Sequence, residues 1–483
     1  MKDNPFFHLF KTPIGFYLYD VNTDKILKIP ESVYVHLLAG DSSVDESAID
    51  YVKELKDKGF LKSNRVLRTM HPLTELLPYY SKNRLSHIIL QITQSCNLRC
   101  SYCVYSGKYK NRTHSNKKMT FSTAKKAIDL LITNSRDSKE LIVGFYGGEP
   151  LLCLGMVKQC INYTINQSEG RKVRFSITTN ATLLTEEIVA YFSENDVSLT
   201  ISLDGPKHIH DKYRKYKKSN KGSYEKLISN VQMIRDKFPD YYMERVLFNT
   251  VLVPDSDFSC INEFILSNKM IDGVQLITSL LDDKYIDNTI SYSEKFVEEQ
   301  SYEVFKLFLY RLGWLTDFEP SNLVLEFFAQ SSRIRKDKYF IDINQLPETS
   351  HHGGPCMPFS RLFVSTDGDF FPCERVSESS EIAKIGNIDC GIDLDKAEKI
   401  LNIERATAAM CYECWAYRYC QVCIGAADDL KEISPTLIKK RCSSVKQSTE
   451  EAFKDYCVFK ELGFDFELGD TYAQLINQRG ENY

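Results

Sequence analysis

Three cysteines at short intervals are the residues of this chain most suited to chemistry. Cys96, Cys100 and Cys103 follow an apolar run at residues 88–92 that is typical of a buried strand. Four thiolates saturate a zinc ion or a four-iron cluster, whereas three leave one iron of such a cluster open to another ligand. Three thiolates would therefore suit a 4Fe–4S cluster with one open iron. A chance triplet in a chain of 15 cysteines is the alternative.

The motifs in and after the triplet resemble those of radical S-adenosylmethionine (SAM) enzymes. Tyr102 precedes the last thiol of the Cys-x3-Cys-x2-Cys arrangement, residues 146–150 read YGGEP, and residues 202–214 read SLDGPKHIHDKYR. This set is similar to one branch of the family, which includes anaerobic sulfatase maturases and peptide maturases. The resemblance implies that the open iron chelates the amino and carboxylate groups of SAM. One electron would then split the sulfonium and give a 5′-deoxyadenosyl radical.

The resemblance also implies which groups hold SAM. The Gly-Gly-Glu motif would hold the amino group of the methionine part, Asn180 lies near the ribose in relatives, and Ser202 would bond the carboxylate. Arg214 offers a fixed cation for a carboxylate, with a structural ion pair as the alternative. His208 and His210 are expected to be loop or core histidines rather than metal ligands. The predicted cofactor contacts are Tyr102, Gly147, Gly148, Glu149, Asn180, Ser202 and Arg214.

A second group of cysteines occupies the C-terminal part of the chain, with eight from Cys356 to Cys442 inclusive. Cys356 and Cys373 bracket Gly368 in a Cys-x11-Gly-x4-Cys arrangement, and a quartet follows. This closely resembles the seven-cysteine SPASM extension, which holds two auxiliary 4Fe–4S clusters. By this resemblance, the outer cluster would be ligated by Cys411, Cys414, Cys420 and Cys442, and the inner cluster by Cys356, Cys373 and Cys423.

The inner set departs from the family pattern and leaves alternatives open. The family usually places three residues between the last two cysteines of the quartet, whereas two separate Cys420 from Cys423 here, which weakens the assignment of Cys423. Three ligands leave this cluster an open iron or an outside ligand, for which His351, His352 and Cys390 are candidates. The structural alternative is a pair of four-thiolate zinc sites with Cys390 as the eighth thiol.

Apolar runs alternate with helical stretches from about Leu85 onward, which is the signature of a parallel α/β sheet. Six strands fit the partial (β/α)6 TIM-like barrel usual in the radical SAM family. Chemistry in such barrels sits at the carboxyl ends of the strands, where the motifs fall. The expected strands are 88–92, 141–145, 173–178, 197–203, 246–253 and 274–277, and the expected helices between them are 122–134, 156–168, 185–194, 223–237 and 259–268.

The start of the chain reads as a separate small module. Residues 16–29 predict a β-hairpin, and helical stretches follow at residues 31–40 and 44–58, which together suggest a winged helix. Peptide-modifying radical SAM enzymes often begin with a similar module, which captures a leader peptide as an added strand. A dimerisation or structural cap and a DNA-binding winged helix are the alternatives, although the helices carry too little positive charge for a groove reader.

These patterns divide the chain into expected domains. The module is followed by the barrel, a linker, the SPASM domain, and a C-terminal helix with a tail. Their expected boundaries are 1–82, 83–320, 321–350, 351–445 and 446–483.

The composition excludes several other classes of protein. The chain has 61 basic and 65 acidic residues, a net charge of −4, which gives no general affinity for nucleic acid. It shows neither an apolar run long enough to span a membrane nor an export signal, so we expect it in the cytoplasm. Cysteines in that reducing compartment argue for metal or redox work. Basic stretches at residues 108–118 and 212–221 are expected as solvated loops, with a path for an acidic peptide as the alternative.

By resemblance, the whole pattern predicts a radical SAM/SPASM peptide maturase of the thioether-forming, ranthipeptide or sactipeptide type. It would remove a hydrogen atom from a ribosomally made precursor peptide and install intramolecular Cys thioether crosslinks, with flavodoxin or ferredoxin as the reductant. Glu374 stands where sulfatase maturases carry an acidic general base, so it is the predicted catalytic residue, with a surface carboxylate as the alternative. Carbon–carbon cyclisation, formylglycine formation on a sulfatase, and an iron–sulfur regulator that binds DNA are the rival functions.

Overall fold

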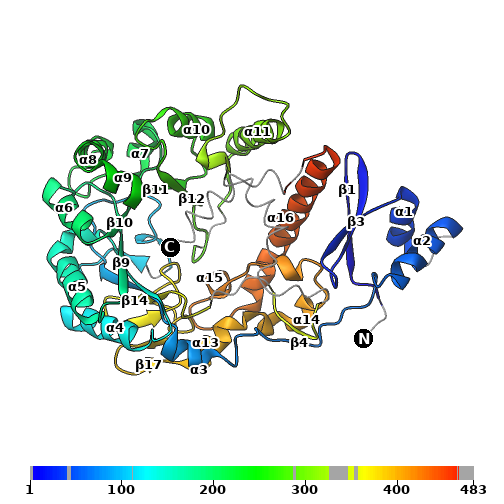
Figure 1. Ribbon diagram of the computed structural model, residues 1–483, viewed down its shortest axis with the longest axis horizontal. Helices are drawn as coiled ribbons and strands as arrows, with labels where there is room; N and C mark the ends of the chain where they lie inside the picture. The colour runs from blue at the N-terminus through cyan, green and yellow to red at the C-terminus, as the bar shows by residue number, and fades with distance from the viewer. Residues whose placement is uncertain are drawn as a thin grey trace.

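The computed structural model describes residues 4–40, 45–110, 112–286, 290–325, 346–352, 357–464 and 466. Its centre is a ten-stranded sheet in the order β12-β11-β10-β9-β8-β5-β14-β15-β16-β17. The first six of these strands are parallel, and each pairs with the next one along the chain (Figure 1). They are β5 (His87–Thr93), β8 (Glu140–Gly147), β9 (Lys172–Thr179), β10 (Val197–Ser202), β11 (Val246–Leu252) and β12 (Gln275–Leu280). The six predicted strands and the large parallel sheet are therefore confirmed.

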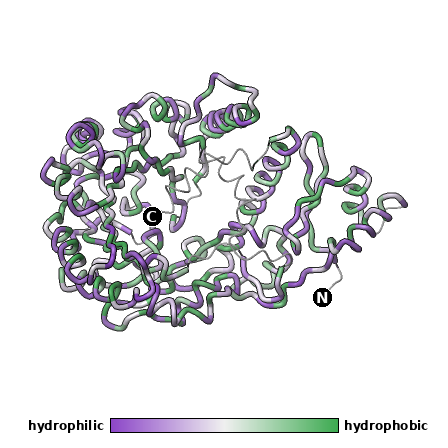
Figure 2. Tube along the Cα trace, in the orientation of Figure 1, coloured by the Kyte–Doolittle hydropathy of each residue, from purple (hydrophilic) through white to green (hydrophobic). Residues whose placement is uncertain are grey.

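Helices pack along the outer side of this curved sheet (Figure 1). The five predicted helices are present, and the side chains of Thr120, Thr185 and Asp257 cap the starts of three of them. Hydrophobic and hydrophilic residues alternate along these helices, as expected for amphipathic elements (Figure 2). They are α4 (Phe121–Thr133), α5 (Leu154–Gln167), α6 (Glu186–Glu194), α8 (Tyr224–Lys237) and α10 (Phe258–Ser267), with α7 (Lys207–Tyr213), α9 (Pro239–Arg245), α11 (Glu294–Arg311) and the 3-10 turn η2 (Pro150–Cys153) in addition.

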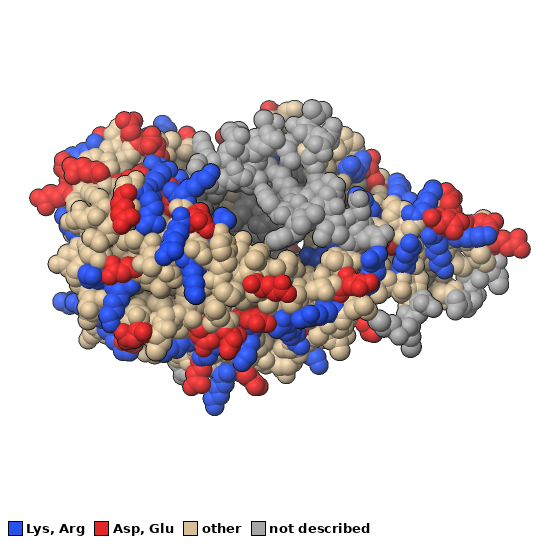
Figure 3. All heavy atoms as spheres, turned by 60° about the horizontal axis from the view of Figure 1, so that its bottom comes forward, with Lys and Arg blue, Asp and Glu red and all other residues tan. Residues whose placement is uncertain are grey.

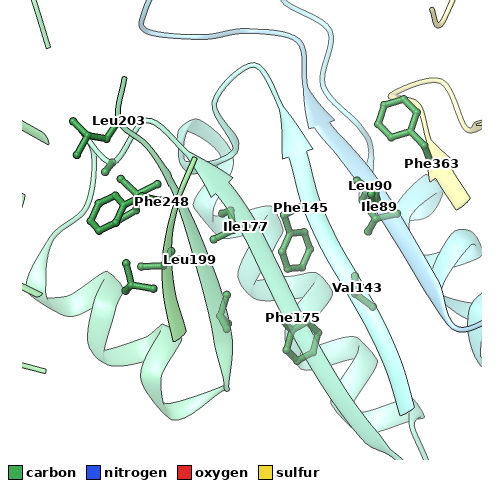
Figure 4. Close-up of a cluster of buried hydrophobic side chains, with 14 of the residues drawn as sticks. Ile89, Leu90, Val143, Phe145, Phe175, Ile177, Leu199, Leu203, Phe248 and Phe363 are labelled. Atoms are coloured by element: carbon green, nitrogen blue, oxygen red, sulfur yellow. The ribbon is translucent and has the colours of Figure 1, made fainter. Parts of the chain in front are cut away.

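The core of the molecule lies along the strands. Figure 4 shows apolar side chains from neighbouring strands side by side, among them Phe145 of β8 and Phe175 of β9, whose ring centroids are 6.3 Å apart. Both rings are fully buried, as are Val143 and Ile177. This packing fixes the spacing of the strands, and therefore the positions of the loops at their carboxyl ends.

The N-terminal module forms a three-stranded antiparallel sheet in the order β1-β2-β3. The predicted hairpin is present as β2 (Gly15–Asp20) and β3 (Lys25–Ile29), and β1 (Phe7–Thr12) adds a strand that the sequence did not predict. One face of this sheet packs on α1 (Glu31–Ala39) and α2 (Glu46–Asp57). The other packs on α16 (Pro435–Glu461) and on residues 411–419, so both faces are covered.

The cysteine-rich segment continues the central sheet. β14 (Leu362–Val364) pairs in parallel with β5, and the hairpin strand β15 (Asp369–Phe371) pairs with β14. The helix predicted after Cys442 begins earlier, at Pro435, so Cys442 lies within α16. Most of the predicted linker (326–345) and the end of the tail (467–483) lie outside the described residues. The other elements are β4 (Arg68–Thr69), α3 (Leu77–Asn83), β6 (Ser106–Tyr109), β7 (Arg112–Thr113), β13 (Thr349–Ser350), β16 (Gly386–Asn387), β17 (Gly391–Ile392), α13 (Leu394–Leu401), α14 (Ala408–Cys411) and α15 (Ile424–Ala427), with 3-10 turns η3 (Ile403–Thr407) and η4 (Tyr417–Tyr419).

Two surface properties bear on the predicted partners. Lys and Arg are interspersed with Asp and Glu on the face drawn in Figure 3, without a field of one sign. None of the described helices combines the length and the apolar character needed to cross a bilayer.

Candidate functional site

The three thiols of the triplet lie together on the loop after β5. Burial raises the pKa of Cys96 to about 12 and of Cys100 to about 12, and it also raises that of Cys103. The thiols influence one another electrostatically. The Leu98 N–H donates to Cys96 Sγ at 3.4 Å, and the Tyr105 N–H donates to Cys103 Sγ at the same distance. Such N–H to sulfur bonds are typical around iron–sulfur clusters, where the metal replaces the thiol protons. The three side chains therefore fit the predicted cluster.

The two basic stretches hold this loop through their backbones. Arg99 N–H donates to Lys215 O at 2.8 Å, and Gln94 N–H donates to Lys117 O at 3.0 Å. The two bonds hold the triplet loop at two points. Lys215 lies just after α7, and Lys117 lies shortly before α4. The stretches are thus part of the frame of the site, and a path for an acidic peptide along them stays a prediction.

Gly147 and Gly148, at the end of β8, also support the loop. A Cβ on Gly147 would lie 2.1 Å from Thr93 O, and one on Gly148 would lie 2.2 Å from Ser95 O. In addition, Gly148 N–H donates to Thr93 O at 2.6 Å, and Glu149 N–H donates to Ser95 O at 2.9 Å. The Gly-Gly-Glu motif was expected to hold the amino group of SAM. The structure shows that its two glycines permit a close approach to the backbone just before Cys96.

Glu149 is 1% exposed and is bound by three donors. Leu151 N–H and the Thr179 hydroxyl donate to Oε1 at 3.1 and 2.8 Å, and Asn180 N–H donates to Oε2 at 2.9 Å. Burial raises the pKa of Glu149 to about 7 against the lowering effect of these bonds. A carboxylate has about four acceptor positions, so three donors leave it capacity for an ammonium group such as the one predicted here.

Asn180 and Ser202 lie at the carboxyl ends of the next two strands. Asn180 Nδ2 donates to Asn97 Oδ1 at 2.9 Å and lies 3.9 Å from Cys96 Sγ, so this amide adjoins the triplet. Ser202 is the last residue of β10 and is buried. The carboxyl ends of β5, β8, β9 and β10 thus bring the predicted SAM contacts to one edge of the sheet.

Arg214 is committed to an ion pair. Its Nε and Nη2 donate to the two carboxylate oxygens of Asp204 at 2.7 and 3.1 Å, and both side chains are buried. Tyr102 OH donates to the same carboxylate at 2.5 Å, and the Arg214 guanidinium lies over the Tyr102 ring at 5.4 Å. Burial acts to raise the pKa of Asp204, but Arg214 outweighs it and holds the pKa below its usual range. The geometry matches the ion-pair alternative for Arg214. Tyr102, one of the predicted SAM contacts, binds the same Asp204 carboxylate.

The two histidines of this motif behave as expected. His210 is fully buried, its Nε2 lies 3.0 Å from Ser223 Oγ, and burial lowers its pKa to about 4. His208 is exposed, with Nε2 at 3.7 Å from Cys260 Sγ. His210 is therefore a neutral core histidine and His208 a surface one.

Four of the later cysteines form a second group. Burial raises the pKa of Cys420 to about 12 and raises those of Cys411 and Cys414, and these thiols and that of Cys442 act on one another electrostatically. Cys423 lies near Arg441. The grouping parallels the set expected for the outer cluster.

The predicted inner set is only partly described. Cys356 lies outside the described residues, while Cys373 follows β15 and Cys423 precedes α15. Of the candidate fourth ligands, Cys390 is exposed, the His351 ring packs on His71, and His352 Nε2 lies 3.6 Å from Glu404. Among the described residues, no group of three or more Cys, His, Asp or Glu side chains is placed to hold a single metal ion.

Glu374 pairs with a surface residue. Arg361, whose side chain is 45% exposed, donates to its two carboxylate oxygens at 3.1 and 3.4 Å. The carboxylate of Glu378, four residues further on, instead enters a buried polar cluster that the sequence analysis missed. Gln91 is the signal that could have found it, because a polar residue stands there inside an apolar strand. The general-base role of Glu374 stays a prediction.

Parts of the chain are similar to known proteins. Residues 90–266 match the model of the radical SAM superfamily. An uncharacterised protein of Methanocaldococcus jannaschii is 36% identical over 30% of this chain, which spans only 46% of that relative. A cysteine-type anaerobic sulfatase-maturating enzyme of Clostridium novyi is 28% identical over 60% of this chain and 73% of its own length. The radical SAM cyclopropyl synthase TigE of Paramaledivibacter caminithermalis is 27% identical over 50% of this chain and 52% of its own length.

Solved structures share the fold. Native anSMEcpe with bound AdoMet has a TM-score of 0.56 and 20% identity, and the match covers 80% of this chain and 99% of that one. A further structure of that protein, with AdoMet and the Cp18Cys peptide, matches with the same TM-score and coverage. At this identity the likeness shows the fold alone. The sequence matches show that the chain contains a radical SAM domain related to those of the anaerobic sulfatase-maturating enzymes and TigE.

Proposed function

We propose that this chain is a radical SAM peptide maturase that forms Cys thioether crosslinks in a ribosomally made precursor peptide. The observation that carries the proposal is the convergence of Cys96, Cys100 and Cys103 with Glu149 and Asn180 at one edge of the sheet. SAM bound at a 4Fe–4S cluster there supplies a 5′-deoxyadenosyl radical that removes a hydrogen atom from the substrate.

The residues around this edge bind and orient SAM in the proposed reaction. The remaining acceptor position of Glu149 takes the ammonium group, and Asn180 lies beside the triplet at the end of β9. Ser202 would bind the carboxylate from the end of β10. Arg214 contributes by fixing Asp204 and Tyr102 rather than by binding SAM directly.

The second cysteine group supports a reaction that ends in a new bond. Cys411, Cys414, Cys420 and Cys442 would hold the outer auxiliary cluster, and Cys356, Cys373 and Cys423 the inner one. An inner set of three cysteines would leave one iron able to hold a substrate thiolate, since thiolate is the natural ligand of Fe–S iron. This thiolate is the reason for proposing a sulfur–carbon bond over a carbon–carbon bond.

The N-terminal module would capture the leader part of the precursor, with flavodoxin or ferredoxin as the reductant. Because α1, α2, α16 and residues 411–419 cover both faces of its sheet, an added strand has only the sheet edges to join. The domain boundaries of the sequence analysis are part of the same proposal, with the helix of the last segment starting at Pro435.

The first test measures 5′-deoxyadenosine formed by the anaerobically reconstituted, reduced protein. Cleavage of SAM is expected, and Cys96→Ala should abolish it, whereas Cys260→Ala, on α10 outside every predicted cluster, should not. A DNA-binding regulator that only senses redox state would not cleave SAM.

The second test co-expresses the chain with a short cysteine-rich open reading frame from beside its coding sequence. Thioether formation removes two hydrogens per crosslink and leaves the cysteine resistant to alkylation, which mass spectrometry resolves. A product that has lost hydrogens but keeps an alkylatable thiol would replace this proposal with carbon–carbon cyclisation. Formylglycine formation, favoured by the names of the relatives, is tested with a cysteine-containing sulfatase peptide in the same assay.

A further inference from the structure

A buried polar cluster adjoins the candidate site without belonging to any predicted contact. It consists of Gln91, Tyr105, Arg112 and Glu378. Gln91 and Tyr105 are buried, and the side chains of Arg112 and Glu378 are only 2% and 12% exposed. Arg112 Nε lies 2.9 Å from Glu378 Oε2. A buried ion pair carries a desolvation penalty that apolar residues would avoid, so it is weak evidence for stability and points to a geometric role.

Glu378 is the centre of the cluster. Tyr105 OH donates to Glu378 Oε1, and Gln91 Nε2 donates to the same oxygen at 2.7 Å. Gln91 Nε2 also lies 2.6 Å from Tyr105 OH, and the Arg112 guanidinium lies 5.1 Å from the centre of the Tyr105 ring. Gln91, Tyr105 and Arg112 therefore each contact Glu378, and Gln91 and Arg112 also contact Tyr105.

The cluster joins two parts of the chain that are far apart in sequence. Tyr105 follows Cys103 by two residues, and its N–H donates to Cys103 Sγ. Glu378 follows Cys373 by five residues and is 287 residues from Gln91. The Gln91 side chain also accepts from Thr366 N–H at 3.1 Å, next to the pairing of β14 with β5. The loop of the SAM-site triplet is thus tied directly to the segment of a predicted inner-cluster cysteine.

We propose that Gln91, Tyr105, Arg112 and Glu378 form a clamp that sets the position of the Cys373 segment relative to the triplet loop. They are positioning residues. The effect on product formation that we expect from them rests on the proposed function. Radical abstraction and the later bond-forming step act on one substrate, so both sites must face it at a fixed separation. A displacement of about 1 Å can cost about a hundredfold in rate.

The test uses reconstituted holoenzyme of two variants and one control. Glu378→Gln removes the charge, and the double variant Arg112→Met/Glu378→Gln removes both charges so that neither is left buried and unpaired. Glu381→Gln is the control, since Glu381 is exposed on the same segment. The readouts are iron content, the magnetic dipolar interaction between the reduced clusters, and crosslinked product formed per 5′-deoxyadenosine.

Both variants are expected to keep their iron and their SAM cleavage, to change the dipolar interaction, and to form about tenfold less product per 5′-deoxyadenosine. The control should match the unmodified enzyme. An unchanged dipolar interaction in the double variant overturns the clamp, and this variant decides the question if Glu378→Gln fails to fold. Absence of crosslinked product from the unmodified enzyme would count against the proposed function alone, because the dipolar measurement does not depend on product.

Discussion

The imidazole of His8 lies stacked on the indole of Trp415, with ring centroids 3.6 Å apart and planes inclined by 4°. Trp415 directly follows Cys414, and His8 Nε2 lies 2.9 Å from Glu450 Oε2 on α16, the helix that carries Cys442. The N-terminal sheet therefore contacts both segments that hold the predicted outer-cluster cysteines. The module is bound to the cysteine-rich part of the chain rather than tethered beside it.

Replacing His8 is expected to weaken the contact between the N-terminal sheet and the cysteine-rich part of the chain. An aromatic stacked pair contributes about 0.5–1.5 kcal/mol, so His8→Ala should speed local amide exchange in β1 and β2 by about fivefold. His8→Phe keeps the stacking and loses only the contact with Glu450, so it should show a smaller increase. Val35→Ala, at an exposed position of α1, serves as the control. Equal exchange in His8→Ala and unmodified protein would show that the stacked pair does not hold the module.

Asp204→Asn is expected to destabilise the chain strongly. The substitution leaves the buried Arg214 guanidinium without its counter-charge, which costs about 3–5 kcal/mol. Asp236→Asn, at an exposed position of α8, should change the free energy of unfolding by about 0.5 kcal/mol or less. Denaturant midpoints compare the two. Similar midpoints would mean that Arg214 does not depend on Asp204 and can instead serve a SAM carboxylate.

The sequence predicted the parallel sheet well because its signals are local. β8 contains an apolar run of strand length, and β9 alternates apolar with polar residues. Helices with capping residues such as Thr185 separate the strands. The same locality explains what was missed. β14 has only three residues, too few for a periodic pattern, and its partner β5 lies more than 260 residues earlier. Strand β1 was missed because its apolar residues are mixed with charged and polar ones.

The candidate site was predictable in its residue types but not in all of its contacts. The triplet loop and Glu149 carry recognisable motifs, so their meeting at one edge followed from the parallel sheet. The pairing of Arg214 with Asp204 depends on side-chain directions that spacing does not give. The link from Gln91 to Glu378 depends on how the cysteine-rich segment folds back, and no local pattern encodes it.

Buried histidines should make the fold acid-sensitive. The pKa of His210 falls from its ordinary 6.5 to about 4, so the folded state binds fewer protons than the unfolded state and stability rises with pH. Its contribution is lost as the pH falls below 6.5, by about 2 kcal/mol between pH 7 and pH 5. His71, His87 and His352, whose pKa values are also lowered by burial, add to the slope. His210→Gln should therefore show a shallower decline in unfolding free energy than the unmodified protein, and parallel curves would contradict this.

Cys442→Ser tests the outer grouping. If Cys442 shares a cluster with Cys411, Cys414 and Cys420, the variant should contain about four fewer irons per chain, the content of one 4Fe–4S cluster. SAM cleavage should persist, because the triplet lies on another loop. Cys457→Ala, on the same helix but buried in an apolar cluster, is the control and should keep its iron. An undiminished iron content in Cys442→Ser would remove Cys442 from the ligand set.

Two glycines in different surroundings separate the role of the Gly-Gly motif from general effects of alanine. In Gly148→Ala the new Cβ would stand 2.2 Å from Ser95 O, a backbone atom that cannot swing away, so the triplet loop must move. The expected cost is about 1–3 kcal/mol of stability, with loss of iron and of SAM cleavage. In Gly155→Ala, in the first turn of α5, nothing lies within 4 Å of the new Cβ, and alanine should stabilise the protein by about 0.4–1 kcal/mol. Unfolding midpoints and iron content of the two variants make the comparison. If Gly148→Ala retained its iron and its SAM cleavage, the motif could not be supporting the triplet loop, and its glycines would have to be explained by direct approach to SAM.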